Sequence, residues 1–187
     1  MKIYYLPGHG GSISNGLGQA LSGRGYDVFG RETVGDFRRL DFNDQVDTIA
    51  QDLIRDFWSK DSRIVANSFG AYLLLHALAK LEPYMGNIIL LSPIVGEFTS
   101  DEVRMGFIPP YSKRLFELAN ANQFPVPKHC SFHVGSEDWQ SNPKNVSTFA
   151  QLLGAPVTIV PHVGHQLPRN YVNQLLDSVF SPNSNEC

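Results

Sequence analysis

The chain has 187 residues, of which 42% are hydrophobic and 18% are charged, with 16 glycines and 12 prolines. This length suits one domain and is short for two, and the balance excludes disorder, collagen and long coiled coils. The formal net charge is −3, and basic residues are scattered apart from Arg38-Arg39, which argues against nucleic acid or an anionic membrane as partner and favours a small molecule.

The two cysteines, Cys130 and Cys187, are too few for a disulfide framework and form no metal-binding or redox motif. We therefore expect reduced thiols. The apolar run at the N-terminus stops at Pro7-Gly8, and no run approaches the roughly 18 apolar residues of a membrane span. These features favour a cytoplasmic protein without a membrane span.

Short apolar runs alternate with stretches of helical period, which is the pattern of a parallel sheet covered by helices. The expected strands are 3–6, 26–29, 63–66, 87–91, 131–134 and 157–160. The expected helices lie at about 14–22, 44–58, 69–81, 112–122, 145–153 and 169–180. The pattern predicts an α/β fold, a three-layer α/β/α sandwich with a mostly parallel six-stranded sheet, as a single domain over 1–187.

The longest stretch without an expected strand lies between Leu91 and Ser131. A long excursion inside a compact domain is often functional, so a short lid-like insertion at about 93–127 and an ordinary crossover helix are both open. The polar tail 181–187 is expected to fray.

The sharpest local signal is Ala66-Asn67-Ser68-Phe69-Gly70, where a β-branched run ends at a serine with a small residue two positions away on each side. Such a sequence is typical of a strand-turn-helix elbow that exposes a nucleophilic serine above the edge of a sheet. The −2 residue is alanine instead of glycine, which makes the motif less specific. On the pentapeptide alone, Ser68 as an ordinary N-cap of the following helix is equally compatible.

A nucleophilic serine needs a base and a group that orients the base. The residues at the ends of the other strands therefore distinguish a nucleophile from an ordinary N-cap. Strand 131–134 runs into a loop that contains Glu137 and Asp138, and strand 157–160 runs into a loop that contains His162 and His165. Because all three loops follow parallel strands, they meet at the edge of the sheet where active sites of open α/β sheets form.

The chain order serine, acid, histidine at these strand ends resembles the α/β-hydrolase superfamily over about 1–180. In that family the nucleophile follows the third core strand as counted here, the acid the fifth and the histidine the sixth. Gly135, three residues before the acid, and Gly164, directly before the histidine, match glycines of the family pattern.

The resemblance implies that Ser68, Asp138 and His165 are catalytic, with Glu137 and His162 as the alternatives. No cofactor is implied. The backbone N–H of Phe69, the residue after the nucleophile, is the first expected oxyanion donor.

The loop Pro7-Gly8-His9-Gly10-Gly11 resembles the family's oxyanion loop and suggests the N–H of Gly11, or else of Gly10, as the second donor. His9 is expected to brace this loop. Low-specificity candidates for substrate binding are His9, Gly10, Phe98, Phe107 and Trp139, within a wider apolar set that adds Phe69, Ile94, Val95, Ile108 and Tyr111.

Residue spacing argues against nucleotide binding and against a metal site. A dinucleotide fingerprint beginning at Gly8-x-Gly10 would need a glycine at Ile13, and no phosphate-loop lysine motif occurs. A metal site built on His162 and His165, with His129, His133 or Asp138, matches no recognised spacing. His76 is expected to be a packing or surface residue.

These observations predict a serine hydrolase that cleaves an ester, thioester or amide bond through an acyl-enzyme on Ser68. The substrate would be a small ester or acyl compound, or an acylated macromolecule. A non-catalytic ligand-binding or protein-interaction module of the same fold, and an acyltransferase with the same triad, remain as alternatives. The short chain leaves little room for a cap, so we expect an open, shallow cleft.

Overall fold

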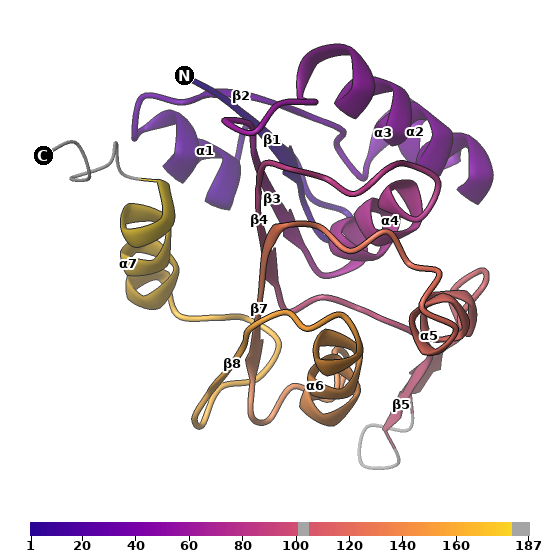
Figure 1. Cartoon of the computed structure of the whole chain (residues 1–187). Coiled ribbons are helices and arrows are strands. Elements are labelled where there is room, and N and C mark those ends of the chain that lie inside the picture. Colours follow the sequence, from indigo (N-terminus) through magenta and orange to yellow (C-terminus); the bar gives the residue numbers. More distant parts are fainter. Residues whose placement is uncertain (101–104, 181–187) are drawn as a thin grey trace, which may run out of the picture.

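A six-stranded sheet in the order β2-β1-β3-β4-β7-β8 runs through the middle of the molecule, and every pair of neighbouring strands is parallel (Figure 1). The computed structural model describes residues 1–100 and 105–180. The sheet strands are β1 (Lys2–Leu6), β2 (Asp27–Gly30), β3 (Arg63–Asn67), β4 (Asn87–Leu91), β7 (His129–Gly135) and β8 (Val157–Val160). All six predicted strands are confirmed, and no strand end differs from its predicted position by more than two residues.

Helices cover both faces of this sheet, with α1 and α7 on one side and α3, α4, α5 and α6 on the other (Figure 1). Their bounds are α1 (Gly16–Ser22), α2 (Gly35–Arg39), α3 (Phe42–Asp56), α4 (Phe69–Leu78), α5 (Arg114–Asn120), α6 (Pro143–Leu152) and α7 (Arg169–Phe180). The predicted three-layer α/β/α architecture is therefore confirmed.

Alternation along the central strands creates two separate cores. In β1, Ile3 and Tyr5 pack with α1 and α7, whereas Tyr4 and Leu6 pack with the helices of the opposite face. All four side chains are at most 4% exposed, because successive strand residues point to opposite faces and both faces are covered. This double burial explains why the strands read as short continuous apolar runs.

Helix α4 is buried almost all round, from Gly70 to Leu78. It follows β3, the strand at the centre of the sheet, and it packs between that sheet and α3. A helix that is apolar on every side belongs in a core. The residue at its N-terminus is thereby held in a fixed place above the middle of the sheet.

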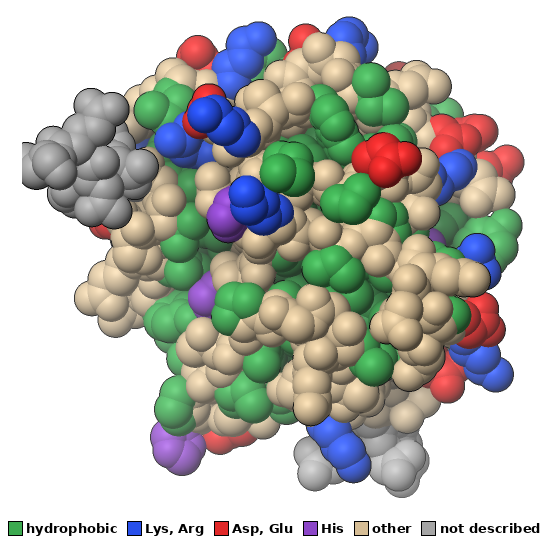
Figure 2. Space-filling view, viewed as in Figure 1, with side chains coloured by type: hydrophobic (Ala, Val, Ile, Leu, Met, Phe, Trp, Pro, Cys, Tyr) green, Lys and Arg blue, Asp and Glu red, His purple; other side chains and the backbone are tan. Residues whose placement is uncertain are grey.

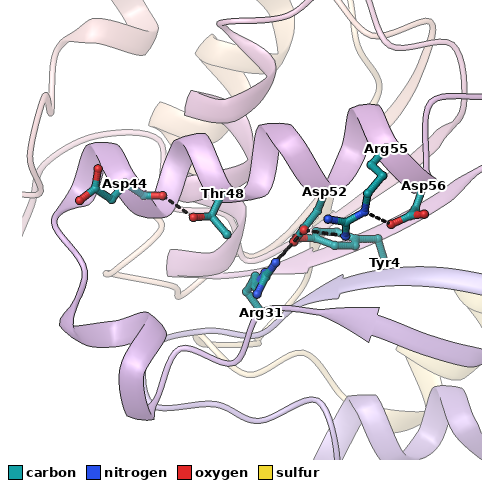
Figure 3. A network of polar contacts seen from close by, with 7 residues as sticks. All are labelled: Tyr4, Arg31, Asp44, Thr48, Asp52, Arg55 and Asp56. Carbon is teal, nitrogen blue, oxygen red and sulfur yellow. Dashed lines mark hydrogen bonds and ion pairs between the residues drawn. The ribbon is translucent and has the colours of Figure 1, made fainter.

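A polar network ties α3 to the sheet (Figure 3). Asp52 accepts hydrogen bonds from the Tyr4 hydroxyl at 2.8 Å and from Arg31 Nε and Nη2 at 2.6 and 2.7 Å. Burial alone raises the pKa of Asp52, but the hydrogen bonds from Arg31 and Tyr4 and the charges of Arg31 and Arg55 outweigh it and lower that pKa. The network joins the start of the sheet to the longest helix.

The sequence missed three short elements. Helix α2 has 5 residues, and β5 (Phe98–Ser100) and β6 (Met105–Phe107) have 3 residues each. Strands β5 and β6 form an antiparallel hairpin within the segment expected to lack strands. Elements this short show no measurable hydrophobic period, which is why the pattern did not reveal them.

Part of the predicted insertion at 93–127 and the whole tail 181–187, with Cys187, lie outside the described residues. Among residues 1–100 and 105–180, no helix is long and apolar enough to cross a membrane. On the face shown in Figure 2, basic and acidic side chains are interspersed with apolar ones instead of forming a patch of one sign.

Candidate active site

Ser68 occupies the turn between β3 and α4 with φ 51° and ψ −119°, a backbone conformation that L-residues rarely adopt. Its amide donates to the carbonyl oxygen of Leu91 at the end of the neighbouring strand, at 3.0 Å. Its side chain makes no cap hydrogen bond to the helix. Ser68 therefore stands at the N-cap position of α4 without capping the helix through its side chain, and the turn has the strand-turn-helix shape that the sequence predicted.

The hydroxyl of Ser68 lies 2.8 Å from Nε2 of His165. On the other side of the ring, Nδ1 of His165 lies 3.0 Å from both carboxyl oxygens of Asp138. An ionised carboxylate only accepts hydrogen bonds, so the Asp138 contact places the ring proton on Nδ1 and leaves Nε2 to accept from the serine. The three side chains form one continuous chain of hydrogen bonds.

The loop after β7 holds Asp138 with its side chain fully buried. Its Oδ1 accepts from the amides of Gln140 and Ser141 at 3.0 and 2.9 Å. The hydroxyl of Ser141 donates to the carbonyl oxygen of Ser92 at 2.5 Å and lies 3.4 Å from Nδ1 of His165. The sequence analysis did not predict a role for Ser141 at this site. Its position three residues after Asp138 was the sequence feature that could have indicated one.

The alternatives for the acid and the base lie together on the surface. Glu137 and His162 are 3.6 Å apart, with 64% and 93% of their side chains exposed, and no contact with Ser68 is seen in the described part of the chain. Gly135 explains the close approach of the two loops, because a Cβ at this position would lie 2.1 Å from the carbonyl oxygen of Val163. The loop with His165 can therefore lie directly against the loop with Asp138.

The loop after β1 differs from the expectation in its hydrogen bonds. The Gly11 amide donates to the carbonyl oxygen of Gly8 at 2.9 Å and contacts Oγ1 of Thr33 at 3.0 Å, and the Gly10 amide donates to the carbonyl oxygen of Thr33. Neither N–H is free for a substrate, so the assignment of Gly11, and of Gly10 in its place, as oxyanion donor is corrected. Thr33 follows β2, and its position after a strand end was the only sequence feature that could have indicated its contact with the first loop.

The same loop lies against the elbow. A Cβ on Gly8 would be 3.1 Å from Cβ of Ser68, and a Cβ on Gly70 would be 2.3 Å from the carbonyl oxygen of Pro7. The glycine at the +2 position thus lets α4 approach the first loop closely. Phe69 is the first residue of α4, and the N–H groups in the first turn of a helix have no partner within the helix.

The expected substrate-binding aromatics lie in one row across the site. Ring centroids are 6.0 Å apart for His9 and Phe69, 6.1 Å for Phe69 and Phe107, 5.5 Å for Phe107 and Phe98, and 5.6 Å for Phe98 and Trp139. The row continues from the first loop through the β5–β6 hairpin to the loop with the acid. Of the wider set, Ile94 and Val95 are at most 4% exposed and belong to the core, whereas Ile108 and Tyr111 are exposed.

Two of the cavities on the described surface lie at opposite ends of the sheet strands. One of about 240 Å³ is lined by His9 and Phe69 and lies next to the elbow. The other, of about 650 Å³, is lined by Asn87 and His129, which begin β4 and β7, and therefore lies at the amino ends of the strands. Only the smaller cavity shares residues with the site around Ser68.

The other histidines and the buried cysteine do not join this site. Burial, with a smaller effect of the Arg114 charge, lowers the pKa of His76 to about 4, and burial does the same for His133. Cys130 is a buried free thiol whose pKa burial raises to about 12. Within 1–100 and 105–180, no three His, Cys, Asp or Glu residues gather as a metal site would require.

Comparison with known proteins rests on solved structures, because no protein-family model and no curated protein sequence matches the chain. The ydeN gene product of B. subtilis is 21% identical, with a TM-score of 0.67 over 97% of this chain and 99% of that one. A carboxylesterase of the thaumarchaeon Nitrososphaera gargenis is 13% identical, with a TM-score of 0.61 over 95% of this chain and 89% of that one.

SOBER1 from Arabidopsis thaliana is 12% identical, with a TM-score of 0.59 over 96% of this chain and 98% of that one. At these identities the likeness concerns the fold, and it covers nearly the whole of each molecule. Together with the parallel sheet and its strand order, it shows that the chain has the α/β-hydrolase fold, as the sequence resemblance predicted.

Proposed function

We propose that the protein is a serine hydrolase that cleaves an ester or thioester bond through an acyl-enzyme on Ser68. The observation that carries the proposal is the hydrogen-bonded chain from Ser68 through His165 to Asp138, on a strained elbow at the carboxyl end of the sheet. The carboxylesterase among the similar structures supports a hydrolase on this fold. The chemistry needs no cofactor.

In acylation, Oγ of Ser68 forms a bond to the substrate carbonyl carbon while Nε2 of His165 takes the hydroxyl proton. The carbonyl π electrons move to oxygen and give a tetrahedral oxyanion. Its collapse breaks the bond to the leaving oxygen or sulfur, which receives the proton from Nε2. Asp138 holds the ring in the required tautomer throughout. A water molecule then attacks the acyl-serine by the same steps and releases the acid.

The oxyanion would be bound by the backbone N–H groups of Phe69 and His9. A planar trans peptide directs its C=O and N–H to opposite sides. The Gly8 carbonyl accepts from the Gly11 amide and the Thr33 hydroxyl, so the N–H of His9 faces away from both. The loop itself lies beside the nucleophile, since a Cβ on Gly8 would be 3.1 Å from Cβ of Ser68. Losing one such donor typically costs about 100- to 1000-fold in turnover.

The aromatic row from His9 to Trp139 would bind the apolar parts of the substrate on both sides of Ser68. Aromatic rings pack against apolar chains and can orient the substrate without any charged contact. Phe107 is 40% exposed and lies in the β5–β6 hairpin, so part of the row is open to solvent. Such a site accepts a small ester or an acyl group carried on a larger molecule.

A fluorophosphonate probe tests this function because it reacts with an activated serine and with little else. The wild-type protein should be labelled, Ser68→Ala should not, and Ser14→Ala, at an exposed serine outside the site, should be labelled like the wild type. Mass spectrometry should locate the label on Ser68. A folded wild-type protein that remains unlabelled would refute the proposal and favour a binding module.

A second measurement separates hydrolysis from acyl transfer. Turnover of a 4-nitrophenyl ester is followed with and without a competing primary alcohol or amine, and the products are identified. Free acid as the main product supports a hydrolase. Quantitative transfer to the acceptor would make the protein an acyltransferase with the same nucleophile.

A further inference from the structure

The pocket of about 240 Å³ beside the elbow has an apolar wall and one basic side chain. His9, Phe69 and Phe107 form the wall nearest the nucleophile, since Phe69 is its neighbour in the chain. Arg38 lies in α2, which follows β2, and β2 is two strands away from β3 in the sheet. Leu40, Phe42 and Pro110 add apolar surface, and Thr33 and Gln45 add uncharged polar groups.

Sheet order decides which part of the substrate this pocket would hold. The strands that carry Asp138 and His165, β7 and β8, lie on one side of β3, and β1 and β2 lie on the other. His165 protonates the leaving group, so the leaving group must lie on the β7–β8 side of Ser68. The acyl chain extends away from it, towards β1 and β2, where the pocket opens.

The charge of Arg38 is uncompensated within the described residues. No carboxylate of 1–100 or 105–180 lies within ion-pair distance of its guanidinium, and none lines the pocket. The neighbouring Arg39, by contrast, is paired with Asp36 at 3.2 Å and does not line the pocket. A guanidinium at the end of an apolar pocket is well suited to bind a carboxylate, often through two hydrogen bonds.

We propose that this pocket selects acyl groups whose far end carries a carboxylate, with Arg38 as the residue that binds it. The inference rests on the proposed function of Ser68 and adds the substrate class, namely esters or thioesters of short dicarboxylic acids. The volume of about 240 Å³ suits a short acyl chain.

The test compares two 4-nitrophenyl esters of equal carbon number, the half-ester of adipic acid and the uncharged hexanoate, with the spontaneous rate subtracted. The quantity measured is the ratio of their kcat/KM values at low salt. The wild type should prefer the half-ester. In Arg38→Gln the ratio should fall about threefold to tenfold, and Arg38→Glu should turn the preference towards hexanoate.

Arg39→Gln is the matched control, because it removes a positive charge one residue away without touching the pocket. It should keep the wild-type ratio. The wild-type preference should also shrink as salt is raised, because an exposed ion pair is screened. Thermal unfolding of each variant shows that the fold is intact.

The outcomes separate the inference from the function on which it depends. Turnover of hexanoate with no preference for the half-ester, or a preference that Arg38→Gln leaves unchanged, overturns the inference while the hydrolase function stands. A protein that turns over neither ester and takes no label on Ser68 overturns both.

Discussion

Replacing His76 by phenylalanine should reduce the acid sensitivity of the fold. His76 is 7% exposed, and its Nε2 has no hydrogen-bond partner among residues 1–100 and 105–180. Its ring lies 4.5 Å from that of Tyr72 and 5.1 Å from that of Phe42. Burial, followed by the Arg114 charge, lowers the pKa of His76 to about 4. The imidazole therefore stays neutral in the folded protein and becomes charged in the unfolded chain.

The sign and the size of the effect follow from proton linkage. Between pH 6.5 and pH 4 the unfolded chain binds a proton at His76 that the folded protein does not, so the free energy of unfolding falls as the pH is lowered. From the unperturbed pKa of about 6.5 to a folded pKa of about 4, the loss between pH 7 and pH 5 is about 2 kcal/mol. This is a large part of the roughly 5 to 15 kcal/mol that stabilises a domain.

Urea unfolding at pH 7 and at pH 5 measures the effect. In His76→Phe the difference between the two free energies of unfolding should be smaller than in the wild type by about 2 kcal/mol. His133 keeps its own contribution in both proteins. An equal difference in His76→Phe and wild type would refute the reasoning.

Three further results are expected. Asp138→Asn should lower kcat/KM by about four orders of magnitude, because an asparagine side chain no longer fixes the His165 tautomer. Glu137→Gln should keep near wild-type turnover. The reverse result would assign the role of the acid to Glu137. Ser141→Ala should lower kcat about fivefold to tenfold with KM unchanged, as expected when one hydrogen bond that positions the acid loop is lost, and an altered KM would contradict this. Asp52→Asn should destabilise the fold by about 2 kcal/mol above pH 5, which is less than for a fully buried pair because Arg31 is 37% exposed. This difference from the wild type should disappear as the pH falls through the lowered pKa of Asp52. Urea unfolding at pH 7 and at pH 3 measures the size of the effect and its pH dependence.

The sequence predicted the sheet and the elbow because their signals are local. A strand covered on both faces reads as a short apolar run, and β3 followed by a small-x-Ser-x-Gly pattern is such a signal. No local signal of this kind separates Asp138 from Glu137. The two residues are neighbours in the chain, yet one side chain is fully buried against His165 and the other is 64% exposed.

The proposed second oxyanion donor, the His9 amide, could not be predicted from the sequence because the choice depends on contacts between distant residues. The Gly11 amide is engaged by Thr33, which is 22 positions away and belongs to the loop after β2. A glycine-rich loop shows which backbone can approach a ligand, but not which N–H groups other loops already occupy. The same holds for Arg38, which reaches the pocket through α2, an element too short to predict.

The end of β4 anchors both Ser68 and the loop that carries Asp138. The Ser68 amide donates to the carbonyl oxygen of Leu91, and the Ser141 hydroxyl donates to the carbonyl oxygen of Ser92. Ser92 has φ 42° and is itself fixed by donating its amide to the carbonyl oxygen of His133 at 2.7 Å. Because these hydrogen bonds end on Leu91 and on the residue directly after it, a shift of either loop alone would break one of them. The end of β4 therefore fixes the position of Ser68 relative to the loop that carries Asp138.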